Sequence, residues 1–210
     1  YCVSEVPSGQ KSKLVLPDGT MVWLNGGSTL KYPNNFSDKK RNVVLDGEGY
    51  FEVTSRNGVP FTVSTSAYDI IVKGTKFNVC AYDIDATSLT SLIEGKIEID
   101  YKDELYEVSP GEGVCINKNK GTVESFRSDV DDSNAWIDGR IEYEKITLAD
   151  FAAKLSRKYG VEVCIENNEI KCHTFRISLK NNETLVQVLD GLQLIIPFEY
   201  TIDKDRIIIK

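Results

Sequence analysis

The sequence has 210 residues, of which 41% are hydrophobic and 10% aromatic, so it can bury one large core or two small ones. Its formal net charge is −7, which leaves no basic field to attract nucleic acid or an anionic membrane surface. No run of about 18 apolar residues and no signal peptide is visible, so the sequence predicts neither a membrane span nor a secretory leader.

Short alternating apolar runs, separated by turns, fill the first part of the chain. A Pro-Asp-Gly turn at 17–19 leads into a strand at 21–24, and Asn25 begins a second turn. Further strands are expected in PFTVST, YDIIVKG, KFNVCAY, TSLTSLIEG, KIEIDYK, LYEVSPGEG and VCINK. Strands spaced by about 8 to 12 residues are typical of all-β folds. The sequence therefore predicts an all-β domain over residues 1–128, either a rolled sheet or a sandwich.

The stretch VVLDGEGYFEV, residues 43–53, places two carboxylates and two glycines between apolar runs. It can be read as an acidic active-site loop or as a turn between two strands. We favour the turn, because Gly47 and Gly49 can both take positive φ without the penalty that a Cβ brings.

A polar, acidic segment, GTVESFRSDVDDSN, ends the first domain and is predicted to be a linker that includes Asp129, Asp131 and Asp132. A second domain is expected over residues 134–210. Its first helix lies in ITLADFAAKLSRKYG, with Thr147 as N-cap and Gly160 at the C-terminal cap.

A second helix is expected in NETLVQVLDGLQ, capped by Asn182. Strands flank both helices, so a strand-helix-strand unit occurs twice about 36 residues apart. The expected product is a small α+β domain with both helices on one face of a single open sheet. Its last strand, RIIIK, is expected at an edge that Arg206 and Lys210 protect from casual pairing.

Chemically reactive motifs are scarce. The only histidine is His173, and no nucleophile elbow, zinc-protease motif or phosphate-binding glycine loop is present. Two of the five cysteines, Cys80 and Cys115, fall in strand patterns and are expected to be small buried hydrophobes. Cys164 and Cys172 end a short loop and leave a disulfide open as an alternative. We expect no catalytic site, no metal site and no cofactor.

Six motifs in order carry a family resemblance. They are LPDGTMVWLNGGSTLKYP, RNVVLDGEGYFEV, PFTVST, VKGTKFNVCAY, LIEGKIEI and VSPGEG, and they span residues 14 to about 117. Together they resemble the periplasmic domain of the FecR family, which comprises anti-sigma factors and sigma regulators that respond to TonB-dependent outer-membrane transporters. The second domain resembles the C-terminal domain of Bacteroidetes-type regulators, which is similar to the short N-terminal signalling domain of secretins and TonB-dependent receptors.

The resemblance implies a periplasmic sensor that relays a transporter's signal to an ECF sigma factor, and not an enzyme. Its expected partner is the periplasmic signalling domain of a TonB-dependent transporter, with no nucleic acid involved. The sigma factor would be bound only by a cytoplasmic domain that this chain lacks. The single inner-membrane helix of the family is also expected to lie outside this chain, so the expected location of this chain is the periplasm, as part of a single-pass inner-membrane protein.

Two sets of residues are singled out. Four residues of the strand GRIEYEK are expected to contact the partner: Arg140, Glu142, Tyr143 and Glu144. Eight residues match family motifs and are interpreted as turn and packing residues, with Glu48 a candidate cap of a backbone amide: Asp18, Gly19, Asn25, Gly47, Glu48, Gly74, Thr75 and Gly95.

One alternative is a secreted carbohydrate-binding β module, because aromatic faces stack on sugars. The aromatic residues that suggest it are Trp23, Tyr32, Tyr50, Tyr82 and Trp136. A third reading, a glycosidase, would need two carboxylates about 5 to 10 Å apart in a cleft.

Overall fold

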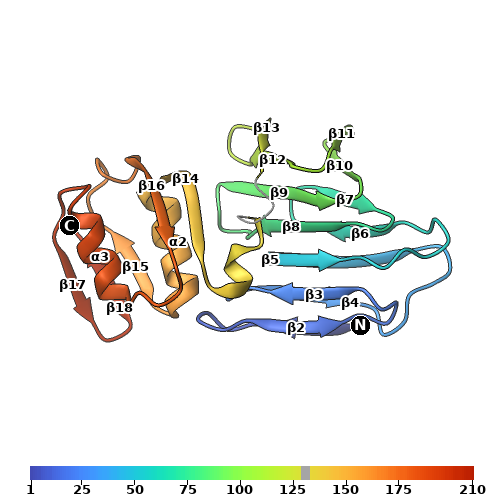
Figure 1. The fold of residues 1–210 in the computed structure, drawn as a ribbon, viewed down its shortest axis with the longest axis horizontal. Coiled ribbons are helices and arrows are strands. Elements are labelled where there is room, and N and C mark those ends of the chain that lie inside the picture. The colour runs from blue at the N-terminus through green and yellow to red at the C-terminus, as the bar shows by residue number, and fades with distance from the viewer. Residues whose placement is uncertain (129–132) are drawn as a thin grey trace. The chain divides into compact units, whose positions relative to one another are not determined.

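The computed structural model describes residues 1–128 and 133–210 and contains two compact units (Figure 1). Unit 1 consists of Tyr1–Val6 and Lys11–Asn134, and unit 2 consists of Pro7–Gln10 and Ala135–Lys210. The carboxylates expected in the linker, Asp129, Asp131 and Asp132, lie outside the described residues.

Unit 1 is built from strands, as the periodicity predicted. They are β1 (Cys2–Glu5), β2 (Ser12–Val15), β3 (Met21–Leu24), β4 (Thr29–Tyr32), β5 (Arg41–Glu52), β6 (Phe61–Ser64), β7 (Asp69–Val72), β8 (Lys76–Ala81), β9 (Thr87–Glu94), β10 (Ile97–Tyr101), β11 (Glu104–Val108), β12 (Glu112–Asn117) and β13 (Thr122–Arg127).

All of these strands join one curled sheet that is organised around β5. The main path runs β11-β10-β7-β6-β5-β8-β9-β12-β13. The first half of β5 pairs with β6 and β4, and its second half pairs with β3 and β8. The two halves of the sheet therefore meet along a single strand. The predicted all-β fold is confirmed, and of the two expected forms it is the rolled sheet.

The stretch 43–53 is not a turn, which corrects the prediction from the sequence. It lies almost entirely within β5, which is one continuous strand (Figure 1). The pairing of this strand passes from one half of the sheet to the other at Gly47. Gly47 has φ +131°, whereas Gly49 is not among the residues with positive φ. Only Gly47 therefore uses the backbone freedom that was expected of both.

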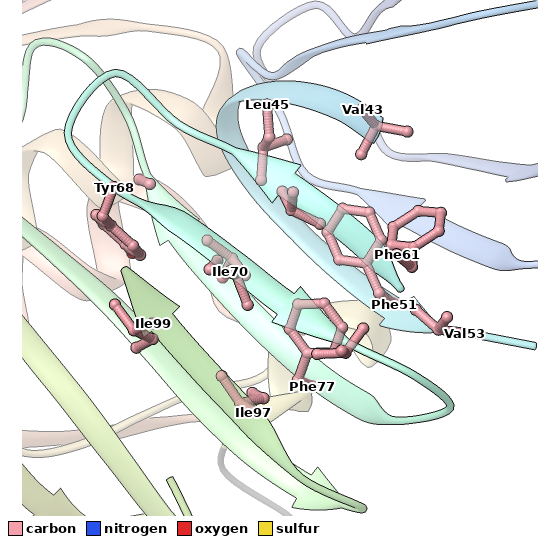
Figure 2. Packing of buried hydrophobic residues seen from close by; sticks show 14 of the residues in the cluster. Val43, Leu45, Phe51, Val53, Phe61, Tyr68, Ile70, Phe77, Ile97 and Ile99 are labelled. Atoms are coloured by element: carbon pink, nitrogen blue, oxygen red, sulfur yellow. The ribbon is translucent and has the colours of Figure 1, made fainter. Parts of the chain in front are cut away.

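The hydrophobic core of unit 1 takes side chains from both halves of the sheet. Phe51 stacks on Phe77 with ring centroids 5.2 Å apart, and it also contacts Phe61 at 6.3 Å. Figure 2 shows these rings beside the aliphatic side chains of the neighbouring strands. Because every second residue of a strand faces one side, odd-numbered residues of β5 such as Val43 and Leu45 point into this core.

Part of the expected linker is a strand. β13 pairs along its whole length with β12, and its Val123 packs against the core. Charged and polar residues at 122, 124, 125 and 127 hid this strand, because an edge strand exposes most of its side chains.

Unit 2 contains a 3-10 helix, two α-helices and five strands among its described residues. They are η1 (Ala135–Asp138), β14 (Ile141–Thr147), α2 (Leu148–Tyr159), β15 (Glu162–Ile165), β16 (Thr174–Leu179), α3 (Leu185–Gln193), β17 (Tyr200–Asp203) and β18 (Arg206–Ile209). Neither of these α-helices combines the length and apolar character needed to cross a bilayer.

The ends of α2 are as predicted, whereas the start of α3 is not. Thr147 accepts a hydrogen bond from the Asp150 backbone N–H, and Gly160 is left-handed at φ 69°. The N-cap of α3 is Thr184, not Asn182. Thr184 forms a capping box with Gln187, which satisfies two backbone groups reciprocally.

The strands of unit 2 form two sheets instead of the single expected one. β14 pairs with β16, while β18 lies between β15 and β17. Each repeat therefore begins in the two-stranded sheet and crosses through its helix to the three-stranded one. The strand RIIIK is central and not at an edge. Side chains from both helices and both sheets share one hydrophobic core.

Candidate functional site

The four residues expected to contact a partner lie at or just before β14. Glu142 accepts a hydrogen bond from Ser178 Oγ at 2.7 Å, and Glu144 forms an ion pair with Arg176 at 2.9 Å. Both carboxylates therefore interact with β16. The neighbouring Tyr143 packs against the core of unit 2.

Two features of β14 limit it as a docking strand. The ring of Tyr143 is covered by Lys154 Nζ, 4.9 Å from the centroid, and the register of the β14–β16 pair shifts between Tyr143 and Ile146. A bulge of this kind interrupts the regular row of backbone groups that an incoming strand would need. Arg140 precedes the strand and donates its backbone N–H to the Ala135 carbonyl. Partner contact by these four residues stays a prediction.

The eight motif residues gather into three clusters in unit 1, the first of which surrounds Glu48. This carboxylate is buried and accepts hydrogen bonds from Asn25 Nδ2 at 2.8 Å and Asn78 Nδ2 at 3.2 Å. It does not cap a backbone amide, which corrects that expectation. The backbone N–H of Glu48 donates a hydrogen bond to Ser28 Oγ at 2.9 Å.

Gly47 is required beside this cluster because Ser28, the residue just before β4, approaches it closely. A Cβ at Gly47 would lie 2.3 Å from Ser28 Oγ and 2.6 Å from Ser28 Cα. Ser28 also contacts the hydroxyl of Tyr82, which donates to the Gly26 carbonyl at 2.8 Å. The cluster therefore holds the point at which β5 changes partners.

The second cluster contains a buried ion pair that the sequence did not reveal. Asp18 accepts from the Thr20 backbone N–H within the predicted turn, where Gly19 has φ +85°. The same carboxylate pairs with Arg41 at 2.9 Å, and both side chains are fully buried. Arg41 was missed because a charged residue at the start of a strand looks solvent-exposed until a distant partner is known.

Arg41 is also held by backbone carbonyls. It donates to Thr54 O and Val59 O, each at 2.6 Å, and its guanidinium lies 5.5 Å from the Phe61 ring centroid. One charged side chain thus joins three separate segments of unit 1, which is the arrangement of a structural clamp.

The third cluster brings Gly74, Thr75 and Gly95 together. A Cβ at Gly95 would lie 2.8 Å from both the Gly74 carbonyl oxygen and Thr75 Oγ1, and Gly95 has φ +98°. Thr75 Oγ1 donates to the Lys96 carbonyl at 3.1 Å. These contacts involve backbone atoms and the Thr75 hydroxyl, as expected for packing residues.

Groups suited to chemistry are dispersed in the described part of the chain. His173 is exposed, and no three metal-binding side chains gather within residues 1–128 and 133–210. Cys164 and Cys172 are free thiols, and Cys80 is buried as expected. Cys115 is half-buried.

The aromatic residues do not form an open platform in unit 1. Trp23 is half-buried, with Lys13 Nζ 4.4 Å from its ring centroid and Tyr50 packed edge-on at 5.4 Å. Tyr50 is itself buried, and burial followed by the charge of Glu52 raises its pKa to about 12. A sugar could not stack on either ring without displacing these neighbours.

The comparisons with known proteins cover both units. A family model described as FecR protein matches residues 3–98, and one described as FecR, C-terminal matches residues 140–209. No curated protein matches the chain. Two crystal structures of a candidate anti-sigma factor from Parabacteroides distasonis ATCC 8503 are similar over nearly the whole length. One is 28% identical, covers 100% of this chain and 99% of that one, and has a TM-score of 0.95. The other is 29% identical, covers 99% and 97%, and has a TM-score of 0.93.

Proposed function

Because the chain belongs to the FecR family of anti-sigma factors, as its motifs predicted, we propose that it is the periplasmic sensor part of a transmembrane anti-sigma factor. In this role it relays a signal from a TonB-dependent outer-membrane transporter to an ECF sigma factor. The family and its fold are regulatory and not catalytic.

One observation carries this proposal: both FecR segments occur in order, one in each compact unit. A relay needs one region that receives the signal and another that passes it on. In this proposal unit 2 receives the transporter's signalling domain, and the sigma factor is contacted by a domain outside these 210 residues.

The physical character of the two units supports a receiver in unit 2. The motif residues of unit 1 are engaged in backbone contacts, buried amides and a buried ion pair. Unit 2 has two small sheets of two and three strands, and small sheets have edges that can accept a strand from a partner. Such recognition needs no cofactor and no catalytic group.

The proposal is tested by titrating the 210-residue chain with purified periplasmic signalling domains of TonB-dependent transporters from the same organism. We expect saturable 1:1 binding with a dissociation constant on the order of micromolar, as for small transient interfaces. A parallel titration with a panel of oligosaccharides provides the comparison. Binding of a saccharide without any binding of the signalling domain would overturn the relay and favour a carbohydrate-binding module.

A further inference from the structure

Strand β17 presents an unpaired edge in unit 2. Just before it, Glu199 and Lys210 exchange both backbone hydrogen bonds, at 3.3 and 2.8 Å. In an antiparallel ladder such bonded pairs alternate with non-bonded ones. Tyr200 and Ile202 are therefore the residues that point their N–H and C=O groups away from β18.

Two other strand edges of unit 2, those of β15 and β14, are obstructed. On β15, the Val163 N–H donates to Ser156 Oγ at 3.0 Å, so a side chain of α2 already occupies that edge. On β14, the register shift coincides with the exposed charges of Glu144 and Lys145. Among the described strands of unit 2, the remaining edge strands β16 and β17 each pair with one neighbour only, and of these two only β17 exposes a large hydrophobic side chain.

The side chains beside this edge are apolar and exposed. Ile202 is 51% exposed, and the large exposed hydrophobic residues described in unit 2 all lie between the start of α3 and the end of β17. Tyr200 donates to Asp190 of α3 at 2.7 Å, which fixes the helix beside the strand. Ile202 has the same strand parity as Tyr200, so it lies on the α3 side of the edge.

Acidic residues flank the edge at both ends. Glu199 and Asp203 are exposed and bracket Tyr200 and Ile202, so the segment reads acidic, apolar, polar, apolar, acidic. In a sheet, opposite charges directly across from each other stabilise pairing, and like charges oppose it. A second copy of this chain would place Glu199 opposite Asp203, which disfavours self-association through this edge.

We propose that β17 is a strand-addition site for a partner strand that reads basic, apolar, any residue, apolar, basic. The pattern is symmetric, so it holds for either strand direction. The partner's apolar side chains pack beside Ile202 and α3, while its Lys or Arg residues face Glu199 and Asp203. With the partner taken as the transporter's signalling domain, this inference rests on the proposed function and locates its contact on β17 instead of β14.

The test compares Ile202→Pro with Ile202→Val in the full 210-residue chain. Proline removes the outward N–H without removing a bond to β18, and edge strands accept proline at such positions. Valine keeps the N–H and the apolar side chain. We expect proline to weaken binding of the signalling domain about ten-fold or more and valine to change it less than two-fold. Asp203→Lys should weaken it as well, because it reverses the charge beside the incoming strand.

A second probe does not depend on the transporter. It is a cyclic hairpin peptide whose outer strand reads Lys-Val-Thr-Val-Lys, with Glu-Val-Thr-Val-Glu as its matched control. We expect the lysine peptide to shift the amide resonances of Tyr200 and Ile202 more than that of Thr201, and the glutamate peptide to have no effect.

The outcomes separate the two proposals. If neither peptide shifts these resonances, the strand-addition site is wrong even when the signalling domain binds. If the signalling domain binds wild type and Ile202→Pro equally, its contact lies elsewhere and this inference fails, while the proposed function stands. If the lysine peptide binds but the signalling domain does not, the edge is supported and the proposed function is overturned.

Discussion

Replacing Gly47 by alanine tests whether β5 must switch between the two halves of the sheet at this residue. Alanine at φ +131° carries a backbone strain of about 1 to 3 kcal/mol. Its Cβ would also lie 2.6 Å from Ser28 Cα, which a side-chain rotation cannot relieve. Overpacking of this kind costs about 1 to 3 kcal/mol more. We expect Gly47→Ala to lower the unfolding free energy of unit 1 by about 4 kcal/mol.

Gly58→Ala is the matched control, because Gly58 has φ +75° but nothing lies within 4 Å of its added Cβ. It should cost only about 1 kcal/mol, from backbone strain alone. Urea unfolding followed by Trp23 fluorescence in a Trp136→Phe background reports on unit 1 separately from unit 2. Equal costs for the two alanine variants would refute a special requirement for glycine at position 47.

Three further predictions concern buried and capping groups. Glu48→Gln should destabilise unit 1 by about 1 to 3 kcal/mol, because its single amide oxygen can accept from only one of Asn25 and Asn78 and its NH2 faces the other donor. It should leave binding of the signalling domain unchanged; lost binding at normal stability would contradict this. Thr184→Ala should cost about 1 kcal/mol in thermal unfolding, whereas Asn182→Ala should cost nothing measurable if Thr184 is the cap. Burial raises the pKa of Tyr50 to about 12, so the neutral phenol stabilises the fold below about pH 10, and this stabilisation is lost as the pH rises toward 12. The urea midpoint of unfolding should therefore fall less between about pH 10 and 12 in Tyr50→Phe than in the wild type. An identical fall in both proteins would argue against a raised pKa of Tyr50.

Features set by neighbouring residues were predictable from the sequence. The cap of α2 depends on Thr147 and Asp150, which are three residues apart. The cap of α3 was misplaced although its signal was present, since Thr184 and Gln187 have the spacing of a capping box. Asn182 is also a good capping residue, and residue type alone does not decide between two candidates so close together.

Features set by distant partners were not predictable. Two apolar runs around a glycine pair fit a hairpin and one continuous strand equally well, and the pairing of β5 with β4 and β8 distinguishes them. Arg41 is buried because Asp18 and two carbonyls surround it, none of which is a sequence neighbour. The division of unit 2 into two sheets likewise depends on pairing between β14 and β16 and between β15 and β18. Strand order of this kind leaves no trace in local periodicity.

Hydrogen exchange of the full chain with and without the transporter's signalling domain tests the central claim most directly, because it measures binding and its location together. The account predicts slower exchange within residues 135–210, strongest at Tyr200 and Ile202, with residues 1–128 unchanged. Slower exchange confined to residues 1–128, or no change at saturating concentrations of the signalling domain, would contradict a receiver in unit 2.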